Sequence, residues 1–321
     1  MHHGDSLLNR SRPDYDEQID SETVQICIAQ TMRRGYDAPY FSRLPIDLHL
    51  SDPDADAFPL RLRFKEFASD TDYQYLPNSA DFYDDLARAG VLKVSVPKAD
   101  SACQPMPRPA PVLSRYGVVR GADGKPNALA WELAGQVFYH TLAVLSAPAY
   151  RQEHAEYLAE DWPRVPLPAS RAVLAQSADL GRRVAELLDP QARPELPGVV
   201  GRLVRAGTQE EAPQDLLTVG PKPRYDAARE TYALSDTLEL AGVPERVWAF
   251  TLGGYPVLKN WVEYRKGRML TLDDAEWLEG IVRRVTALLE LGAELDLAYA
   301  GATATGPEPD SGPENADKLP E

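Results

Sequence analysis

The chain has few of the residues from which membrane spans, disulfide frameworks and metal centres are built. No apolar run approaches the roughly 18 residues of a transmembrane helix, and the first five residues are polar, unlike a secretory signal. There are 2 cysteines and 5 histidines, too few cysteines for a disulfide framework or, alone, for a four-ligand zinc site. We therefore expect a soluble, cytoplasmic protein without a membrane partner or a metal site.

The motifs of self-contained catalysis are also missing. The sequence contains no GxGxxG, no P-loop GxxxxGK[ST], no HExxH and no GxSxG. No glycine-rich turn follows a strand, as a site for S-adenosylmethionine requires, and we expect His140 and His154 to pack among aromatic helices rather than to bind a ligand. We therefore predict no catalytic, cofactor-binding or metal-binding residue in this chain, which is not expected to be an enzyme on its own.

The charge is strongly acidic overall but uneven. The chain has 34 basic and 49 acidic residues, a net charge of -15, which argues against a general nucleic-acid coat. Residues 61–129 are the exception, with 10 cations against 8 carboxylates. A local basic patch therefore remains open.

The composition and the hydrophobic periodicity predict an α+β (mixed α/β) fold in four segments. We expect a flexible N-terminus over 1–22, a strand-rich part over 23–129, a helical part over 130–300 and a disordered acidic tail over 301–321.

Three strands are predicted in the strand-rich part. Residues 24–29 are β-branched and alternating, and residues 91–96 form a short second candidate. Between them, Leu60, Leu62 and Phe64 alternate with three cations, so a period of 2 places the cations together on one face.

Helices dominate the second half. Apolar residues recur at a helical period over 133–145, and Ser146 is predicted to cap a further helix that runs to about residue 160. Another helix is predicted over 170–188, and a hairpin over 232–240. A long amphipathic final helix starts at Thr271, because Asp273 and Asp274 in its first turn suit the helix dipole.

Two passages carry a family resemblance. The first is FYHTLAVLSAPAYR (138–151), which leads into Tyr157-Leu158 and DWPRVP (161–166); the second is VPERVWAFTLGGYPVLKNW (243–261), which continues to Arg268. A weaker third match covers residues 26–29, 46–49 and 58–60. In this order they resemble the C-terminal target-recognition (specificity) region of type ISP restriction-modification enzymes, which are adenine-specific DNA methyltransferases, over about residues 24–300.

The resemblance implies a sequence-specific module that binds duplex DNA and lacks the catalytic domains. Nothing in the chain corresponds to the nuclease, helicase-like or methyltransferase parts of such enzymes, and the methyltransferase motif NPPY is absent, since Asp37-Ala38-Pro39-Tyr40 only superficially echoes it. A methyltransferase or restriction subunit is therefore the implied partner, and S-adenosylmethionine would belong to that partner.

Two groups of residues are candidates for DNA contact, because Arg, Lys and Asn reach base edges and phosphates. Arg61, Arg63 and Lys65 share the strand face, and the second group is Lys259, Asn260, Arg265, Lys266 and Arg268. A solvated strand face explains the first group equally well, and a helix C-terminus closed by Gly267 explains the position of the second.

The aromatic residues of the second passage have two interpretations. Tyr255, Trp261 and Tyr264 can stack on a base, but at helical spacing we predict that they belong to the core, together with Trp248 and Phe250.

Two other functions stay open from the sequence. The net charge and the acidic tail fit an acidic protein-interaction or DNA-mimic module, and the missing catalytic parts fit a non-functional fragment of a broken methyltransferase gene.

Overall fold

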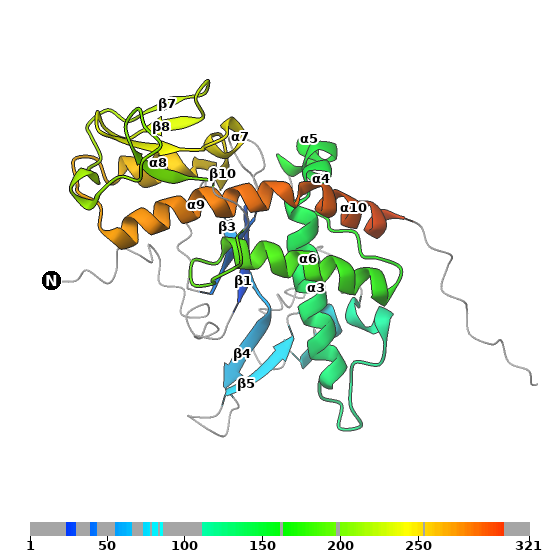
Figure 1. Cartoon of the computed structure of the whole chain (residues 1–321). Coiled ribbons are helices and arrows are strands. Elements are labelled where there is room, and N and C mark those ends of the chain that lie inside the picture. Colours follow the sequence, from blue (N-terminus) through cyan, green and yellow to red (C-terminus); the bar gives the residue numbers. More distant parts are fainter. Residues whose placement is uncertain are drawn as a thin grey trace, which may run out of the picture.

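The computed structural model describes residues 24–29, 39–43, 55–65, 73–77, 79–82, 84–85, 111–160, 163–196, 200–252 and 254–304. It is a mixed α+β fold, as the sequence predicts: two small antiparallel sheets, a layer of long helices and a further lobe (Figure 1). No helix within these ranges is long and apolar enough to span a membrane.

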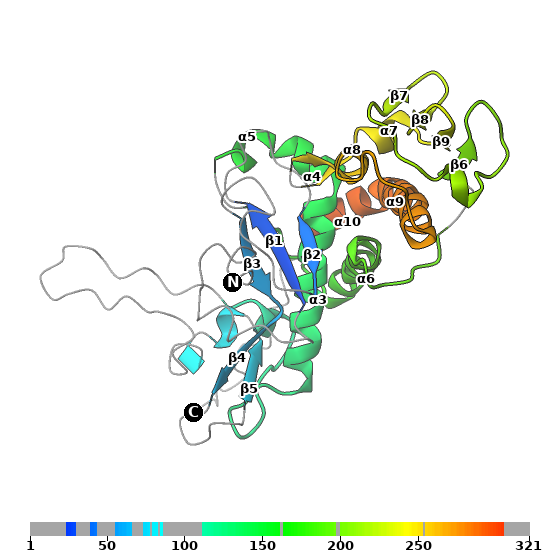
Figure 2. The same cartoon turned by 90° about the vertical axis from the view of Figure 1, so that its left-hand side faces the viewer.

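The first sheet has the strand order β2-β1-β3 and packs on the helical layer. Its strands are β1 (Gln25–Ala29), β2 (Tyr40–Ser42) and β3 (Ala55–Pro59), all antiparallel. Ile26 pairs with Phe41 on one side of β1 and with Phe58 on the other. The predicted strand over 24–29 is thus confirmed, and Figure 2 shows this sheet beside α3.

A separate two-stranded ribbon follows, formed by β4 (Arg61–Lys65) and β5 (Tyr73–Pro77). The predicted strand with alternating cations is therefore present. Along the chain, two short 3₁₀ helices come between the ribbon and the long helices: η1 (Ala80–Phe82) and η2 (Leu113–Tyr116). The predicted strand over 91–96 lies outside the described residues.

Two long helices form the centre of the molecule. They are α3 (Ala128–Ser146) and α6 (Arg171–Leu188), capped by the side chains of Asn127 and Ser170 respectively, so the helix predicted over 170–188 is confirmed. They approach closely at Gly181, where a methyl group would overlap the carbonyl of Tyr139.

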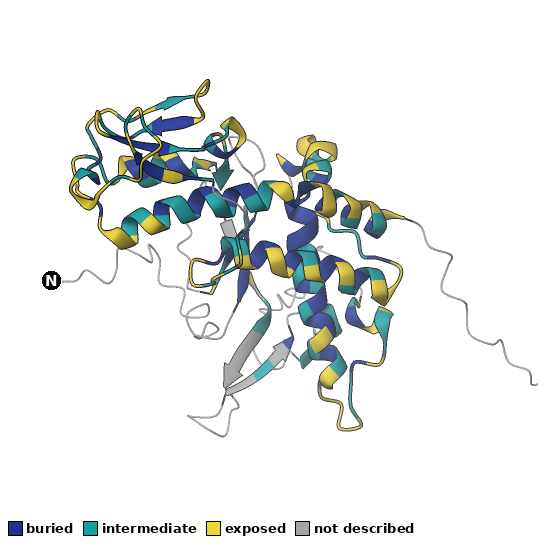
Figure 3. Cartoon of the chain, in the orientation of Figure 1, coloured by how far each residue is buried: buried dark blue, intermediate teal, exposed yellow. Residues whose placement is uncertain are grey.

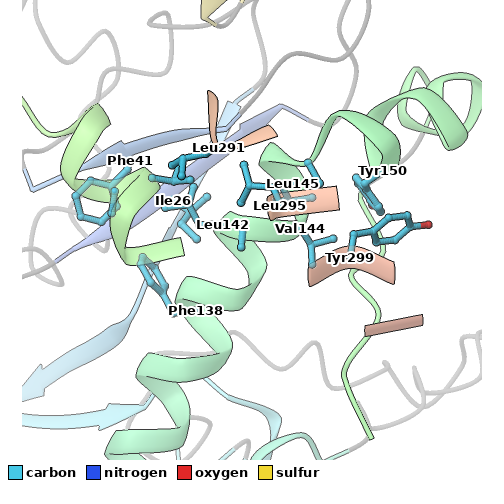
Figure 4. Packing of buried hydrophobic residues seen from close by; sticks show 14 of the residues in the cluster. Ile26, Phe41, Phe138, Leu142, Val144, Leu145, Tyr150, Leu291, Leu295 and Tyr299 are labelled. Carbon is cyan, nitrogen blue, oxygen red and sulfur yellow. The ribbon is translucent and has the colours of Figure 1, made fainter. Parts of the chain in front are cut away.

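The main hydrophobic core lies where these helices meet the first sheet. Ile26 and Phe41 from the sheet pack with Leu142 of α3 and with Leu295 of α10 (Gly292–Thr303), as Figure 4 shows. One core thus joins the start of the described chain to its end.

The prediction that Ser146 caps the next helix is wrong. Ser146 is the last residue of α3, and Ala147 adopts an extended ψ of 124° before Pro148, because a proline disfavours helical geometry in the residue before it. The following helix also stops earlier than predicted. It is divided into α4 (Pro148–Glu153) and α5 (Ala155–Leu158), with His154 between them.

The further lobe is built on a four-stranded antiparallel sheet of order β6-β9-β8-β7. Its strands are β6 (Arg202–Arg205), β7 (Arg224–Asp226), β8 (Thr231–Ala233) and β9 (Leu238–Ala241). The β8–β9 pair is the predicted hairpin, whereas β6 and β7 were not predicted. Its smaller elements are η3 (Gln214–Leu216), α7 (Glu245–Trp248), β10 (Thr251–Leu252), β11 (Tyr255–Pro256) and α8 (Val257–Glu263).

Helix α9 (Leu272–Glu290) connects this lobe to the helical layer (Figure 1). Thr271 accepts from the backbone of Asp274, whose carboxylate accepts from Thr271, so the predicted start of the helix is confirmed as a capping box. Helix α10 follows after Leu291 and ends at Thr303, so the helical structure passes the predicted boundary at residue 300 by three residues. Residues 305–321, most of the predicted tail, lie outside the described ranges.

Candidate nucleic-acid interface

Helix α8 carries most of the second candidate group, and the strand pair before it fixes its position. Leu252 of β10 pairs with Tyr255 of β11, and Gly254 between them has a φ of 79°. The amide of Val257 then donates to the carbonyl of Phe250 at 3.2 Å. The pairing of β10 with β11 therefore fixes where helix α8 begins.

One face of α8 is buried in the core of the lobe. Leu258 and Val262, four residues apart, are fully buried there. Trp248 stacks on Tyr225, with ring centroids 4.6 Å apart, and packs beside this core together with Phe250 and Trp261. The prediction that these three aromatic residues are structural is confirmed.

Two of the predicted cations on this element are exposed. Lys259 lies on α8 and Arg268 lies in the turn that follows it. Within the part of the chain that the structure describes, neither forms an ion pair with a carboxylate. Both therefore remain available to an external anion such as a phosphate.

Arg265 and Lys266, in contrast, have internal partners. The Arg265 guanidinium lies over the Trp261 ring, 3.8 Å from its centroid, and its Nε is 3.2 Å from Oδ1 of Asp274. Hydrogen bonds from Thr271, together with Arg265, lower the pKa of Asp274, which stays ionised as the cap of α9. Lys266 pairs with Glu263 at 2.6 Å. These two cations hold the α8–α9 turn to the lobe.

Asn260 is half-buried on α8. Its carbonyl accepts from the amide of Tyr264 at 3.2 Å, and its side-chain amide makes no hydrogen bond to any residue that the structure describes. The amide is thus free to contact a ligand.

Exposed apolar side chains are concentrated in the part of the sequence that surrounds this turn. Four of the seven exposed large hydrophobic residues in the described ranges belong to the segment 255–272. They are Tyr255 (42% exposed), Tyr264 (77%), Met269 (62%) and Leu272 (61%).

The prediction that Tyr255 and Tyr264 belong to the core is therefore wrong. Tyr264 follows the buried Val262 by two residues, about 200° around a helix, so its ring faces away from the core. A helical projection from Leu258 and Val262 would have shown this from the sequence.

The turn itself is pinned to the sheet side of the lobe. Gly267 has a φ of 72° and donates to the carbonyl of Val219 at 2.8 Å, while Val219 donates back to Arg268 at 3.0 Å. Lys222 and Arg224 follow three and five residues after Val219 and are exposed, without an ion pair to a described carboxylate. Sequence reasoning missed them, although cations alternate with prolines in 221–224.

The first candidate group lies elsewhere. Arg61 on β4 stacks its guanidinium 4.3 Å from the centroid of the Tyr75 ring. The register places Arg63 opposite Tyr75 and Lys65 opposite Tyr73, and the side chains of Arg63 and Lys65 lie outside the described part. The ribbon and α8 are at opposite ends of the molecule in both views (Figures 1 and 2), so the structure does not bring the two groups together.

His140 and His154 pack within the helical layer, as predicted. His140 is fully buried between Ser177 Oγ and the carbonyl of Pro166, each at 2.8 Å, and burial lowers its pKa. His154 contacts the hydroxyl of Tyr299 at 3.0 Å. Among the described residues, no three His, Cys, Asp or Glu side chains are grouped so as to hold a metal ion.

Two cavities lie along α6 and α9. One, of about 280 Å³, is mostly apolar and is lined by Phe250, Trp261 and Trp277 among others. The other, of about 470 Å³, has four glutamates and one arginine in its lining: Arg183, Glu186, Glu195, Glu290 and Glu294. Its charge does not suit a polyanion, which sets this face apart from that of Lys259 and Arg268.

Comparisons with known proteins point to one family. The family model described as "Type ISP C-terminal specificity domain" matches residues 1–280, most of the chain. No curated protein matches the chain.

Similar solved structures include two Type ISP restriction-modification enzymes and a DrdV–DNA complex. A nuclease-deletion mutant of the Type ISP restriction-modification enzyme LlaGI, in complex with a DNA substrate mimic, has a TM-score of 0.51 and 14% identity, over 88% of this chain and 22% of that chain. The ATP-dependent Type ISP restriction-modification enzyme LlaBIII, bound to DNA, has a TM-score of 0.54 and 10% identity, over 89% and 16%. A DrdV–DNA complex has a TM-score of 0.50 and 17% identity, over 87% and 24%. The chain thus spans about a fifth of the length of these proteins.

Proposed function

Because the chain belongs to the Type ISP C-terminal specificity domain family, we propose that it binds duplex DNA and recognises a target sequence for a DNA-modifying enzyme. Two similar structures are described as Type ISP restriction-modification enzymes with DNA or a DNA substrate mimic, and a third as a DrdV–DNA complex, which supports the same ligand here. The lobe that contains the four-stranded sheet and α8 is the part of the chain that we expect to contact the ligand.

The observation that carries this proposal is a pair of exposed cations, one on helix α8 and one in the turn that follows it. Lys259 and Arg268 lack acidic partners among the described residues, although the chain has a net charge of -15. An acidic protein is repelled by DNA over most of its surface, so binding has to be concentrated where cations are free. The half-buried Asn260 follows Lys259 on α8, and an asparagine side chain can pair with an adenine edge in the major groove.

The ribbon β4–β5 is a second proposed contact. The cations of β4 lie on alternate residues, and a two-stranded ribbon fits the major groove of B-DNA. Since the ribbon and α8 lie at opposite ends of the molecule, we assign them separate contacts on the duplex.

Catalysis, in this proposal, belongs to a partner. The chain spans about a fifth of the length of the similar enzymes, and a methyltransferase or restriction subunit would supply the chemistry and bind S-adenosylmethionine. The specificity module would place the target adenine relative to that subunit.

The test is selection from a randomised duplex pool by the purified chain across a salt series, followed by sequencing of the retained duplexes. We expect one enriched motif and an affinity that falls as salt rises. Retention of no duplex at low salt, with or without a methyltransferase partner, would contradict the proposal.

A second candidate function is docking of a protein partner at the acidic cavity. The four glutamates around this cavity favour a partner surface that carries cations. Replacing Glu186 and Glu290 with glutamine should then weaken binding of the catalytic subunit and leave duplex binding unchanged. Loss of duplex binding in this variant would contradict the separation of the two faces.

A further inference from the structure

Large exposed apolar side chains flank an exposed arginine in the α8–α9 turn. Tyr264, Met269 and Leu272 are each more than half exposed, and Arg268 lies between them in the sequence. We call this set, together with Lys259 on α8, the turn surface. It lies at the end of the lobe where α9 begins, which Figure 3 shows as exposed.

We propose that Tyr264 and Met269 form an apolar wedge that enters a groove of the target duplex and packs against its bases, while Arg268 and Lys259 hold the flanking phosphates. This inference rests on the proposed function and adds a second means of recognition to it. The wedge would favour sequences whose base steps open easily, so specificity would arise at positions that receive no base-edge hydrogen bond.

Exposure is the first reason. Soluble proteins seldom leave several large apolar side chains exposed together unless the surface binds something. The segment 255–272 holds four of the seven such residues in the described ranges. The remaining three are isolated: Phe58, Val118 and Leu297.

Charge decides between occupants of this surface. The segment 255–272 contains four cations and one carboxylate, and two of the cations have no acidic partner among the described residues. Asp273 and Asp274 follow at the start of α9, where they complement the helix dipole and Asp274 is engaged with Arg265. Apolar side chains flanked by free cations match a groove floor of stacked bases between two rows of phosphates.

The residue types also suit a wedge. Apolar side chains such as methionine unstack base steps when they are inserted from the minor groove, and a tyrosine ring stacks on any exposed base. Tyr264 ends α8, and its ring is the most exposed of the aromatic residues in the described ranges.

The backbone presents the wedge in a fixed position. Amides of the turn bond to the carbonyls of residues three or four positions earlier, and Gly267 and Leu270 donate to the segment 217–219. Arg265 adds a side-chain clamp to α9 through Asp274. A preorganised wedge loses little conformational freedom on binding.

The test uses the intact chain and the duplex enriched from the randomised pool, with a scrambled duplex as reference. Tyr264→Ala and Met269→Ala are compared with Leu297→Ala, a residue that is 75% exposed on α10. Affinity is measured across a salt series, and fluorescence of 2-aminopurine, placed at each target position in turn, reports unstacking.

We expect Tyr264→Ala and Met269→Ala to weaken target binding by about 5- to 150-fold, as the loss of one stacked base does. The salt dependence should stay unchanged, the 2-aminopurine signal should be lost, and Tyr264→Phe should retain target binding. Arg268→Gln should instead reduce the salt slope by about one unit.

Wild-type affinity in Tyr264→Ala and Met269→Ala, with a wild-type chain that binds its target, would overturn the wedge and leave the proposed function standing. The wedge would also be overturned if Tyr264→Ala or Met269→Ala bound DNA normally but no longer bound the methyltransferase subunit, because the turn surface would then be a protein interface. Failure of the wild-type chain to retain any duplex would instead defeat the proposed function itself.

Discussion

The packing of α3 against α6 makes a sharp prediction about one glycine. An alanine Cβ at position 181 would lie 2.5 Å from the carbonyl carbon of Tyr139 and closer still to its oxygen. Both obstacles are backbone atoms of the neighbouring helix, so no rotamer change relieves the overlap and the helices have to move apart. We expect Gly181→Ala to unfold more easily than the wild type.

The magnitude follows from two opposing effects. Alanine in a helix interior is favoured over glycine by about 1 kcal/mol, whereas overpacking costs about 1–3 kcal/mol. Because the clash is with backbone at the centre of the largest helix pair, we place the cost at the upper end, and expect a net destabilisation of about 2 kcal/mol.

Gly135, in α3, is the matched control, because a Cβ there meets nothing within 4 Å. Gly135→Ala should therefore raise the free energy of unfolding by about 0.5–1 kcal/mol. Urea denaturation followed by circular dichroism measures both variants. If Gly181→Ala is as stable as Gly135→Ala, the close approach of α3 and α6 is refuted.

Three further predictions concern polar anchors. Asp81 is partly buried, which raises its pKa, but bonds from Ser114 and from the backbone of 112–114 outweigh this and lower the pKa to about 2. The ionised Asp81 should stabilise the fold by about 1 kcal/mol after allowance for its exposure. This contribution should be complete above pH 3.8 and should disappear as the pH falls through about 2. If urea melts show that Asp81→Asn lowers stability equally at pH 7 and pH 2, the prediction is contradicted. Arg284 donates to the carbonyls of residues 186, 187, 189 and 192. Arg284→Lys should therefore lower the free energy of unfolding by about 1–3 kcal/mol. In the same melts the control Arg182→Lys, at an ion-paired surface position, should change it very little. Arg265→Ala should lower the free energy of unfolding by about 1–2 kcal/mol, because its contacts with Trp261 and Asp274 are lost. Lys259→Ala should leave the urea midpoint unchanged. Equal effects of the two variants would contradict the assignment of Arg265 as an internal anchor and Lys259 as a free cation.

Local signals predicted the long helices well because their ends are set by nearby residues. Ser170 and Thr271 each cap a helix through their own side chains, and the apolar period behind them is regular. The β8–β9 hairpin was predictable for the same reason, since its strands pair across a turn of a few residues.

Pairing between distant segments was not predictable in this way. Strand β6 pairs with β9, which lies more than thirty residues later in the chain. The proline-rich stretch between them has no hydrophobic periodicity that would predict this pairing. At the break between α4 and α5, the ring of His154 bonds to Tyr299 of α10, a contact between residues that are far apart in the sequence.

The sequence names the candidate cations but does not distinguish their structural environments. Lys259, Arg265, Lys266 and Arg268 look alike in the sequence, and only their neighbours divide them into two free cations and two internal anchors. The prediction for Tyr264 was wrong because helical spacing alone does not show which face of the helix a residue is on. Its position relative to the buried Leu258 and Val262 places it on the exposed face.

The most direct test of the central claim is the salt dependence of binding to the enriched duplex for the wild type and for Lys259→Gln/Arg268→Gln. The control is Arg182→Gln/Arg183→Gln, which removes the same charge from ion-paired positions on α6. We predict that the slope of log affinity against log salt falls by about two units in the first variant and is unchanged in the control. Equal slopes in all three proteins would contradict the assignment of the α8–α9 turn as the DNA interface.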